Sequence, residues 1–263
     1  MMLDSSRYTP ESSYRARVQR RVTQWRCVKP LKVTPRRPVV SFTFDDFPRS
    51  AGETGARILE EAGARGTFYV SSSMTRQKNL MGDMYAPDDL VRLSAAGHEI
   101  AAHTHLHLDC SRVGPSQVVD EVRLNRDALS AFGVKAPASQ FAWPYGETKY
   151  EAKKALASEV ETARGIRPGI NRKGADLMQL RAFELTPEPH RAEQARQALK
   201  EVAKRSGWVI IFTHDVRSDP SRFGTHPDVL AALVQQARES GAQILPVSEA
   251  MAQIRADLPV GAL

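Results

Sequence analysis

The stretch that decides the fold runs from Val39 to Asp46 and reads VVSFTFDD. An apolar run that ends in two adjacent carboxylates is typical of a buried strand with polar residues at its carboxyl end. Successive side chains of an extended chain point in opposite directions, so Asp45 and Asp46 face different surroundings. One carboxylate can therefore ligate a cation while the other stays free to act as a base.

The next chemically informative stretch is HTHLH, from His103 to His107. Two His residues four positions apart on a helical turn lie on one face, where both imidazoles can reach one ion at about 2.0–2.1 Å. With Asp46 they make a set of two His and one carboxylate that leaves positions open for water and substrate. Adjacent Asp residues also occur in loops, where they cap helices or bind their own backbone, and His pairs also occur on solvated surfaces. Their joint occurrence favours a catalytic metal site.

Short apolar runs alternate with amphipathic stretches from residue 38 to the end of the chain. The runs that we predict as strands are Val39–Phe44, Gly66–Val70, Glu99–Ala102, Gln140–Trp143, Thr162–Ile166, Leu180–Leu185, Trp208–Thr213 and Gln243–Val247. The stretches that we predict as helices are about 52–63, 87–96, 116–132, 147–158, 190–205, 226–240 and 248–256. Repeated strand-helix units predict a parallel sheet, here a single (β/α) barrel of the distorted seven- to eight-stranded, TIM-like type.

In such barrels the catalytic groups follow the carboxyl ends of the strands. The candidate residues obey this rule: Asp45 and Asp46 follow the first run, His103 and His107 the third, Pro144 and Tyr145 the fourth, and His214 and Asp215 the seventh. Four strand ends that carry polar motifs are expected to converge on one face of the barrel.

The net charge of +7 over 263 residues is concentrated in one segment. Residues 1–37 carry ten Lys and Arg against two acidic residues, a net charge of +8, so residues 38–263 sum to −1. We therefore expect a basic N-terminal arm over 1–37 and a nearly neutral catalytic barrel over 38–263. A neutral body argues against a nucleic-acid-binding core.

Within the arm, Tyr14, Val18, Val22 and Trp25 recur at roughly helical spacing, which predicts a short amphipathic helix around 11–26. This helix could pack on its own barrel, remain solvated, or make weak contact with an anionic membrane surface. No continuous apolar stretch resembles a signal peptide or a membrane span, so a cytoplasmic protein is expected. Cys27 and Cys110 are expected to be free thiols.

The motifs, taken in this order, resemble those of the polysaccharide deacetylase family, also called NodB-homology or carbohydrate esterase family 4 proteins, over about residues 38–250. TFDD, from Thr43 to Asp46, is similar to the first family motif, which implies Asp45 as the catalytic base and Asp46 as a metal ligand. HTHLH is similar to the second motif, H-[ST]-x-x-H, which implies His103 and His107 as metal ligands.

The remaining two motifs lie further along the chain. FAWPYG, from Phe141 to Gly146, resembles the third motif, which implies that Pro144 and Tyr145 wall the groove and that the Tyr145 N–H contacts the oxyanion. FTH, from Phe212 to His214, resembles the last motif, which implies an acetyl pocket and His214 as general acid.

Two positions depart from the family pattern. Phe47-Pro48 stands where Gly is common, so we expect a different loop backbone or groove floor. Ala142 stands where many members have an Arg that braces the catalytic Asp. Arg181, beside the sixth run, is our leading substitute, and the alternative is an ordinary exposed Arg.

The mechanism expected from these groups is hydrolysis by activated water. A divalent cation on Asp46, His103 and His107 lowers the pKa of bound water towards ~7 in favourable zinc sites. Asp45 takes the proton of the attacking water, and the Tyr145 N–H stabilises the oxyanion by roughly 3 kcal/mol. His214 protonates the departing amine or alkoxide.

These expectations lead to three functional hypotheses. The first is removal of acetyl groups from N-acetylated amino sugars of an oligosaccharide, glycolipid or polysaccharide precursor, with an acetylated carbohydrate as partner. The second is an O-acetyl esterase or non-sugar amide hydrolase, and the third is a glycan-binding protein without turnover.

Zinc is the expected metal, with cobalt, nickel and manganese as alternatives. Phe47, Trp143, Tyr145 and Tyr85 are candidates for stacking on sugar rings, with core packing as the alternative for Trp143. The sequence does not decide the oligomeric state.

Overall fold

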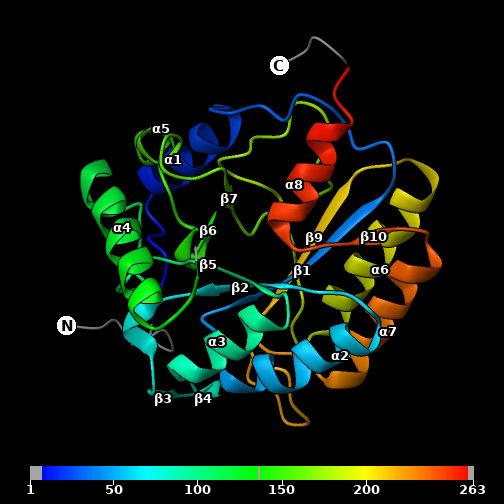
Figure 1. Cartoon of the computed structure of the whole chain (residues 1–263). Helices are drawn as coiled ribbons and strands as arrows, with labels where there is room; N and C mark the ends of the chain where they lie inside the picture. Colours follow the sequence, from blue (N-terminus) through cyan, green and yellow to red (C-terminus); the bar gives the residue numbers. More distant parts are fainter. Residues whose placement is uncertain (1–7, 136, 260–263) are drawn as a thin grey trace.

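A curled parallel sheet forms the centre of the molecule (Figure 1), which is a computed structural model describing residues 8–135 and 137–259. Its strands are β1 (Val39–Asp45), β2 (Thr67–Val70), β5 (Glu99–Ala102), β6 (Ala138–Ala142), β7 (Thr162–Arg164), β8 (Phe183–Glu184), β9 (Trp208–Thr213) and β10 (Gln243–Ile244). Seven of them lie in the order β7-β6-β5-β2-β1-β9-β8, and β10 pairs with β1. All of these pairings are parallel.

The two edges of the sheet come close to each other. A parallel bridge joins Arg164 of β7 to Leu180, which leads into β8, and the Gly165 N–H donates to the Leu180 carbonyl at 2.9 Å. The sheet therefore approaches a closed barrel, which confirms the predicted fold class.

Eight α-helices surround the sheet (Figure 1) in the part of the chain that the structure describes. They are α1 (Tyr14–Trp25), α2 (Ala56–Glu61), α3 (Pro87–Ala95), α4 (Pro115–Ala131), α5 (Tyr150–Leu156), α6 (Pro189–Lys204), α7 (Pro227–Glu239) and α8 (Val247–Ala256). Shorter elements are the π-turn η2 (Ala51–Gly55), the 3₁₀ turns η3 (Ser72–Met74) and η4 (Pro144–Gly146), and a hairpin of β3 (Lys78–Asn79) and β4 (Gly82–Asp83). Four of the helices start at Pro, a residue whose fixed φ suits the first helical turn.

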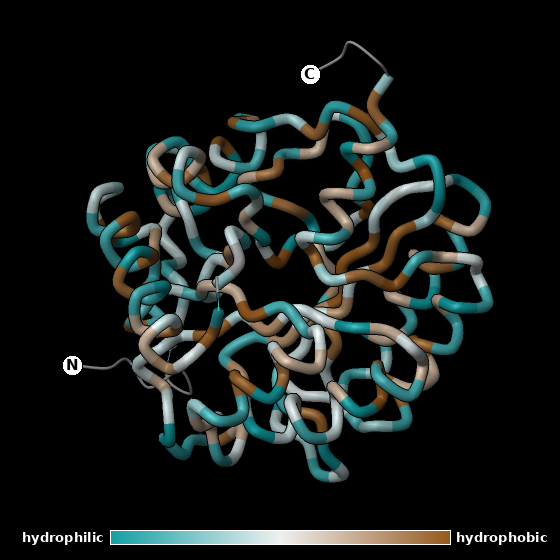
Figure 2. Tube along the Cα trace, in the orientation of Figure 1, coloured by the Kyte–Doolittle hydropathy of each residue, from teal (hydrophilic) through white to brown (hydrophobic). Residues whose placement is uncertain are grey.

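The two central strands, β1 and β9, are buried along their whole length, and Figure 2 shows them as the hydrophobic centre of the molecule. Their side chains alternate between two apolar clusters, as the two-residue period of a strand requires. Phe42 and Phe44 belong to the cluster that includes Leu230 of α7. Val39 belongs to the other cluster, and Asp45 shares its side of β1 by parity. Both faces of β1 are therefore packed, as expected of a parallel sheet.

The sequence predicted each of the eight sheet strands and the seven helices after residue 38, with small shifts of their ends. Among the strands, the largest shift of a start is at Leu180–Leu185, where only Phe183–Glu184 forms a strand. The β3–β4 hairpin was not predicted, because its two-residue strands carry no apolar alternation. The division into an arm over 1–37 and a barrel over 38–263 stays a prediction.

The N-terminal segment lies against the barrel at the α5 side. The Lys153 ammonium of α5 is buried and donates to the carbonyls of Thr23 and Arg26 at 2.7 and 2.9 Å. Arg20 of α1 binds both carboxylate oxygens of Glu147 at 2.8 and 2.9 Å. These contacts fix α1 beside the loop that follows β6.

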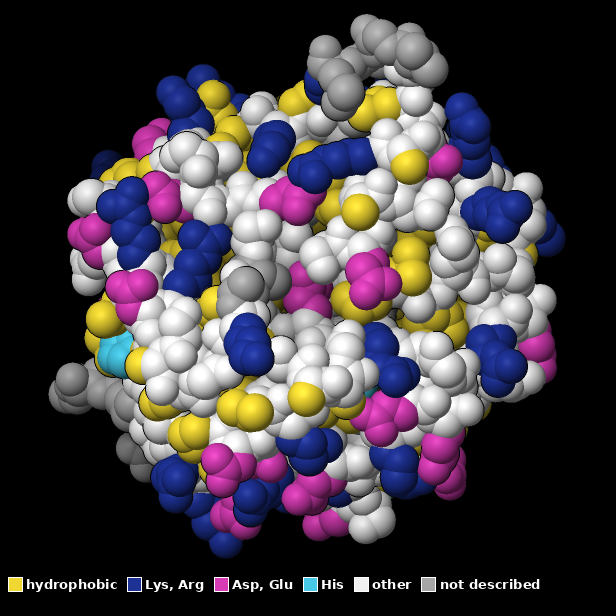
Figure 3. Space-filling model, in the orientation of Figure 1, with side chains coloured by type: hydrophobic (Ala, Val, Ile, Leu, Met, Phe, Trp, Pro, Cys, Tyr) yellow, Lys and Arg dark blue, Asp and Glu magenta, His cyan; other side chains and the backbone are white. Residues whose placement is uncertain are grey.

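Lys and Arg side chains are interspersed with Asp and Glu over the face shown in Figure 3, without one continuous basic field. None of the helices in the described ranges has the length and apolarity needed to cross a bilayer. Cys110 is buried and Cys27 is exposed, and both are free thiols as expected.

Candidate active site

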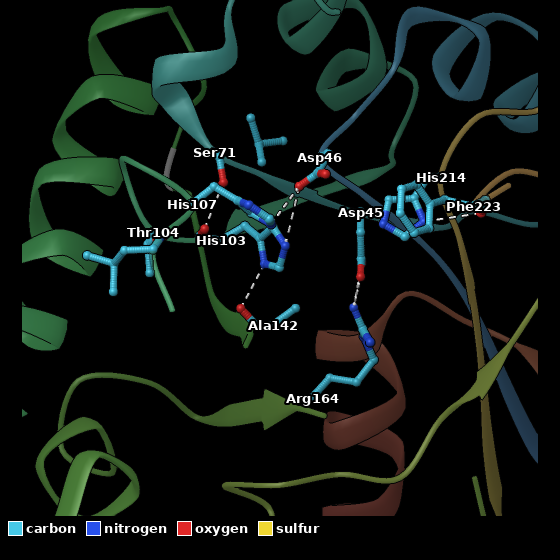
Figure 4. A network of polar contacts seen from close by, with 12 residues as sticks. Asp45, Asp46, Ser71, His103, Thr104, His107, Ala142, Arg164, His214 and Phe223 are labelled. Atoms are coloured by element: carbon cyan, nitrogen blue, oxygen red, sulfur yellow. Dashed lines mark hydrogen bonds and ion pairs between the residues drawn. The ribbon is translucent and has the colours of Figure 1, made fainter. Parts of the chain in front are cut away.

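Asp46, His103 and His107 lie together at the carboxyl end of the sheet (Figure 4). Their ligand atoms all lie within 4.8 Å of one another, and all three residues are buried. The Nε2 atoms of His103 and His107 are 3.5 and 3.1 Å from Asp46 Oδ1. The structure thus brings together the three residues that the sequence predicted as metal ligands.

The hydrogen-bond partners of these three side chains are those expected if a cation is bound between them. The His103 Nδ1–H donates to the Ala142 carbonyl at 2.8 Å, which leaves the Nε2 lone pair directed towards Asp46. Within the described residues, Asp46 Oδ1 is buried and accepts no hydrogen bond. The His103 Nε2 lone pair and the Asp46 carboxylate oxygen that faces it repel each other unless a cation lies between them. The donor set, two imidazoles and one carboxylate, suits zinc and related divalent ions.

Burial sets the protonation state of the two imidazoles. It lowers the pKa of His103 to about 4 and that of His107 to about 3. Both rings are therefore neutral at neutral pH, which is the form that ligates a metal.

The loops that carry these residues adopt strained backbone conformations. Six non-glycine residues in the described ranges have positive φ, and five of them belong to or adjoin the motifs: Asp46, Phe47, Thr104, His107 and Tyr145. Left-handed conformations of such residues are costly and persist where the surrounding structure enforces them, often at functional sites. Three of these residues, Asp46, His107 and Tyr145, line one cavity, so the strained backbone coincides with the site.

Asp45 points away from Asp46, His103 and His107 and binds Arg164 (Figure 4). The Arg164 Nη2 contacts both carboxylate oxygens of Asp45, and both side chains are buried. Burial acts to raise the pKa of Asp45, but the opposing contributions, led by the charge of Arg164, together hold that pKa below its ordinary value. Burial raises the pKa of the neighbouring Asp46. The two adjacent carboxylates are therefore in different environments, as the sequence predicted.

His214 lies on the opposite wall, directly after β9, and is held by the loop that follows it. Its Nδ1 lies 3.2 Å from the Phe223 carbonyl, so Nδ1–H donates there and Nε2 remains for the cavity. Asp215 is buried and binds the Ser221 N–H and hydroxyl, with Arg217 Nε at 3.0 Å. Asp215 thus closes the loop that positions Phe223.

A cavity of about 290 Å³ opens over these groups. It is lined by Tyr8, Pro10, Asp45, Asp46, His103, His107, Trp143, Tyr145, Gly146, Glu147, Ile166, Glu184, Phe212, His214, Arg222 and Phe223. The Tyr145 ring packs edge-on against His107, with 4.4 Å between ring centroids. Pro144 is buried at the start of η4, whose turn places Tyr145 at the cavity wall. Asp45, the Asp46–His103–His107 cluster, Tyr145 and His214 thus share one cavity.

Comparison with known proteins points to the family whose motifs the sequence resembles. The polysaccharide deacetylase profile matches residues 32–161. This segment belongs to the polysaccharide deacetylase family. The chain is 30% identical over 142 residues to a chitooligosaccharide deacetylase of Bradyrhizobium sp. (strain ANU 289), an alignment that covers 51% of this chain and 61% of that protein.

Solved structures also share the fold. The chitin deacetylase of Colletotrichum lindemuthianum superposes with a TM-score of 0.59 at 19% identity, covering 84% of this chain and 92% of that one. A family 4 acetyl xylan esterase of Clostridium thermocellum, solved with a cobalt ion, gives 0.58 at 20% identity, covering 81% and 90%. These likenesses support the barrel fold over most of the chain.

Arg164, and not Arg181, braces Asp45. Arg181 is exposed and packs against Gly169, and its backbone pairs with the Asn171 side chain. The prediction for Arg181 was therefore wrong. Ala142 of β6 and Arg164 of β7 are register partners, so the cation comes from the neighbouring strand instead of from position 142.

Arg164 is itself held tightly. Its guanidinium carbon lies 4.5 Å from the ring centre of Phe212 and 5.2 Å from that of Tyr69, and Nη1 donates to the Gly165 carbonyl at 2.9 Å. A sequence signal existed: an Arg inside a predicted buried strand needs a charged partner.

Phe47 keeps the backbone conformation that glycine favours, with φ of 59°, at the position where the family commonly has Gly. Its side chain is fully buried and packs on Phe68 and Tyr85 with centroid distances of 5.0 and 5.3 Å. Neither Phe47 nor Tyr85 lines the cavity, so the expectation that they stack on sugar rings was wrong. The difference at this position lies beneath the groove, in the core.

Tyr8 is a cavity residue that sequence reasoning missed. Its ring stacks on Tyr145 with 3.6 Å between centroids, and its hydroxyl donates to Asp109 Oδ2 at 2.7 Å. Arg112 adds a bond from Nη2 to the Thr9 carbonyl at 3.0 Å. The start of the described chain therefore forms one wall of the cavity. No local pattern reveals this contact, because more than 100 residues separate the partners.

Proposed function

We propose that the protein is a metal-dependent hydrolase that removes acetyl groups from N-acetylated amino sugars. One observation carries the proposal: a buried Asp46–His103–His107 cluster and a separately held Asp45 share one cavity with His214. A binding protein has no need of a base and an acid on opposite sides of a metal site. The sequence relative by name acts on chitooligosaccharides, which favours an amide-linked acetyl group.

The ion would be held by Asp46 Oδ1 and the Nε2 atoms of His103 and His107. When bound, a divalent ion polarises the acetyl carbonyl and acidifies water. Because both imidazoles are neutral and His103 is oriented by the Ala142 carbonyl, the protein supplies preformed ligands. Zinc is the proposed native ion, with cobalt, nickel and manganese as alternatives.

Asp45 is the proposed general base. Arg164 keeps Asp45 ionised and fixes the carboxylate by contacts to both oxygens. An ionised, oriented carboxylate accepts the proton of the attacking water as the bond to the acetyl carbon forms. The Tyr145 backbone N–H is the proposed oxyanion donor, at a residue of η4 that lines the cavity and has a φ of 59°.

His214 is the proposed general acid. Its Nδ1–H is bound by the Phe223 carbonyl, so a proton on Nε2 is the one that can leave. Transfer of this proton to the sugar nitrogen as the C–N bond breaks yields a neutral amine and acetate. An unprotonated amine is a poor leaving group, so this step is most important for an amide substrate.

The cavity favours a small carbohydrate or the end of a chain. Its volume of about 290 Å³ is at the lower end of ligand pockets. Tyr145 offers an aromatic surface for a sugar ring, and Glu147 and Glu184 line the cavity as acceptors for hydroxyl groups. Tyr8 and Pro10 bound it on the side of the N-terminal segment.

An O-acetyl esterase is the second candidate, because the same groups would cleave an acetyl ester. A family 4 acetyl xylan esterase shares the fold, which supports this alternative at the level of architecture. An alkoxide needs less help from a general acid than an amine does. The two candidates therefore differ in how strongly they depend on His214.

Acetate release tests the proposal. Metal-loaded wild type would be assayed on N-acetylated chitooligosaccharides and on an acetylated xylan. Asp45→Asn is the test variant, and Asp120→Asn at an exposed site on α4 is the matched control. We expect release from the chitooligosaccharides that Asp45→Asn abolishes and Asp120→Asn retains. Release from the xylan alone would favour the esterase, and release from neither by metal-loaded protein would reject both.

A further inference from the structure

The outer side of α1 carries an exposed apolar stripe. Tyr14, Val18, Val22 and Trp25 follow one another at intervals of four, four and three residues, so they lie on one face of the helix. Tyr14 and Trp25 are 82% and 83% exposed, values unusual for aromatic residues. The stripe thus presents an aromatic ring at each end of the helix and two valines between them.

The contacts of α1 with the barrel hold this stripe outward. Thr23 is buried on the opposite side of the helix, and Arg20 pairs with Glu147. The fully buried Lys153 binds the carbonyls of Thr23 and Arg26 at the carboxyl end of the helix. The Ser13 hydroxyl caps the first turn by accepting from the Ala16 N–H at 3.2 Å. The stripe is therefore a fixed surface on a docked helix.

The charges around the stripe are of one sign. α1 contains four Arg and no acidic residue. Arg20 turns to the barrel, whereas Arg15, Arg17 and Arg21 are exposed. At 100° per residue, Arg15 lies on one side of the stripe and Arg17 and Arg21 lie on the other. An aromatic and aliphatic face bordered by Arg is the pattern of a helix that lies in the plane of a membrane surface.

We propose that α1 docks the protein on an anionic lipid bilayer, with Tyr14, Val18, Val22 and Trp25 in the interface and the flanking Arg residues on lipid headgroups. Charge favours this occupant over a second copy of the chain. Two copies packed stripe to stripe would bring two all-basic helices together, whereas anionic headgroups neutralise the exposed Arg residues.

Docking through α1 has a consequence for the catalytic cavity. Glu147, which anchors Arg20, lines the cavity, and Tyr8 forms part of its wall. Because Arg20 of α1 binds Glu147, α1 lies at the rim of the cavity, and a membrane-bound protein would hold this rim near the lipid headgroups. The proposal concerns binding and stands independently of the reaction at the site.

Trp25 supplies a direct optical test. The chain has three Trp residues, and Trp143 and Trp208 are buried in the core. The full-length protein would be titrated with phosphatidylcholine vesicles containing phosphatidylglycerol and with pure phosphatidylcholine vesicles. We expect a blue shift of Trp emission and co-sedimentation with the anionic vesicles, both weakened by added salt.

Two variants separate the stripe from the charges, and circular dichroism would verify that each is folded. Tyr14→Ser combined with Val22→Ser removes the apolar contact while keeping the reporter, and Leu124→Ser on α4 is the exposed apolar control. Arg15→Gln with Arg21→Gln removes two charges, and Lys200→Gln with Lys204→Gln on α6 is the charge control. We expect both α1 variants to lose roughly tenfold or more in vesicle affinity while the controls match wild type.

Three results would overturn the proposal. The first is wild type that neither shifts its emission nor co-sediments with anionic vesicles. The second is equal binding by wild type and the α1 variants. The third is self-association of wild type in sedimentation, removed by Tyr14→Ser with Val22→Ser and unaccompanied by vesicle binding, which would assign the stripe to a second copy.

Discussion

The two ends of strand β5 carry buried histidines with different partners. At the start of the strand, His98 Nδ1 accepts from the Gly66 N–H and Nε2 lies 3.0 Å from Glu60 Oε1. At its end, His103 also binds a backbone group through Nδ1, but its Nε2 faces Asp46 at 3.5 Å. His98 is satisfied entirely by protein atoms, whereas His103 is satisfied on one side only. Burial alone therefore does not mark a metal ligand, but the unmatched Nε2 does.

The largest expected effect comes from removing a proposed metal ligand at the carboxyl end of β5. His103→Ala should reduce acetate release by about 10³-fold or more, because several kcal/mol of transition-state stabilisation depends on the ion. His98→Gln should retain most of the activity. Steady-state assays with added zinc would measure both, and equal losses in the two variants would contradict the distinction between the two ends of β5.

Asp45→Asn should have the second-largest effect on activity. It removes the proposed base and should lower kcat by roughly 10²–10⁴-fold while leaving the metal content at the wild-type level. It also leaves Arg164 buried without its charged partner, so the melting temperature should fall. Kinetics, elemental analysis and thermal unfolding on one preparation would check all three outcomes. A variant that loses its metal would show that Asp45 is a ligand.

Arg164→Met should have an intermediate effect, with Arg181→Met as the matched control. Arg164 holds the pKa of Asp45 below its ordinary value, so its removal raises that pKa. The base is then protonated over a wider range, and the acid limb of the kcat/KM profile should move to higher pH with a loss of roughly 10–100-fold. A pH profile for each variant would measure the shift. An unmoved profile in Arg164→Met, or the same shift in Arg181→Met, would reject the brace.

Tyr8→Ala should have a smaller effect that is confined to substrate binding. The ring stacks on Tyr145 at the cavity wall and lies outside the group of proposed catalytic residues. We expect KM for a chitooligosaccharide to rise several-fold with kcat within about twofold of wild type, since stacking is worth roughly 0.5–1.5 kcal/mol. Comparison with Tyr150→Ala on α5 controls for loss of a partly exposed Tyr. A fall in kcat alone would argue against a binding role.

The smallest expected effect concerns stability at the other end of β5. Burial lowers the pKa of His98 below its ordinary value of 6.5, so the unfolded chain binds a proton more readily than the folded one. The stabilisation by neutral His98 is present above about pH 6.5 and is lost as the pH falls below that value. His98→Gln should therefore show a shallower loss of unfolding free energy between about pH 7.5 and 5.5 in urea titrations. A slope equal to that of wild type would contradict this assignment.

The two ends of β5 also show which features of the site could be predicted from the sequence. The strand ends, and with them Asp46, His103 and His107, followed from local apolar runs and short motif spacings. Parallel strands place their carboxyl ends at one edge, so local patterns were sufficient to predict the cluster.

The groups that sequence reasoning missed depend on contacts between distant segments. Arg164 reaches Asp45 because β6 and β7 pair with Ala142 beside Arg164, a register that no single segment encodes. Tyr8 reaches Tyr145 because the arm crosses the barrel rim, held by Arg20 and Lys153. Phe47 adopts a glycine-like conformation because Phe68 and Tyr85 hold its ring, which a motif comparison does not reveal.

The central claim is that Asp46, His103 and His107 hold one divalent ion. Calorimetric titration of zinc into metal-stripped wild type, His103→Ala and His98→Gln tests it most directly. The account predicts about one ion for wild type and for His98→Gln, and no specific binding for His103→Ala. Absence of binding by folded wild type, or unchanged binding by His103→Ala, would contradict it.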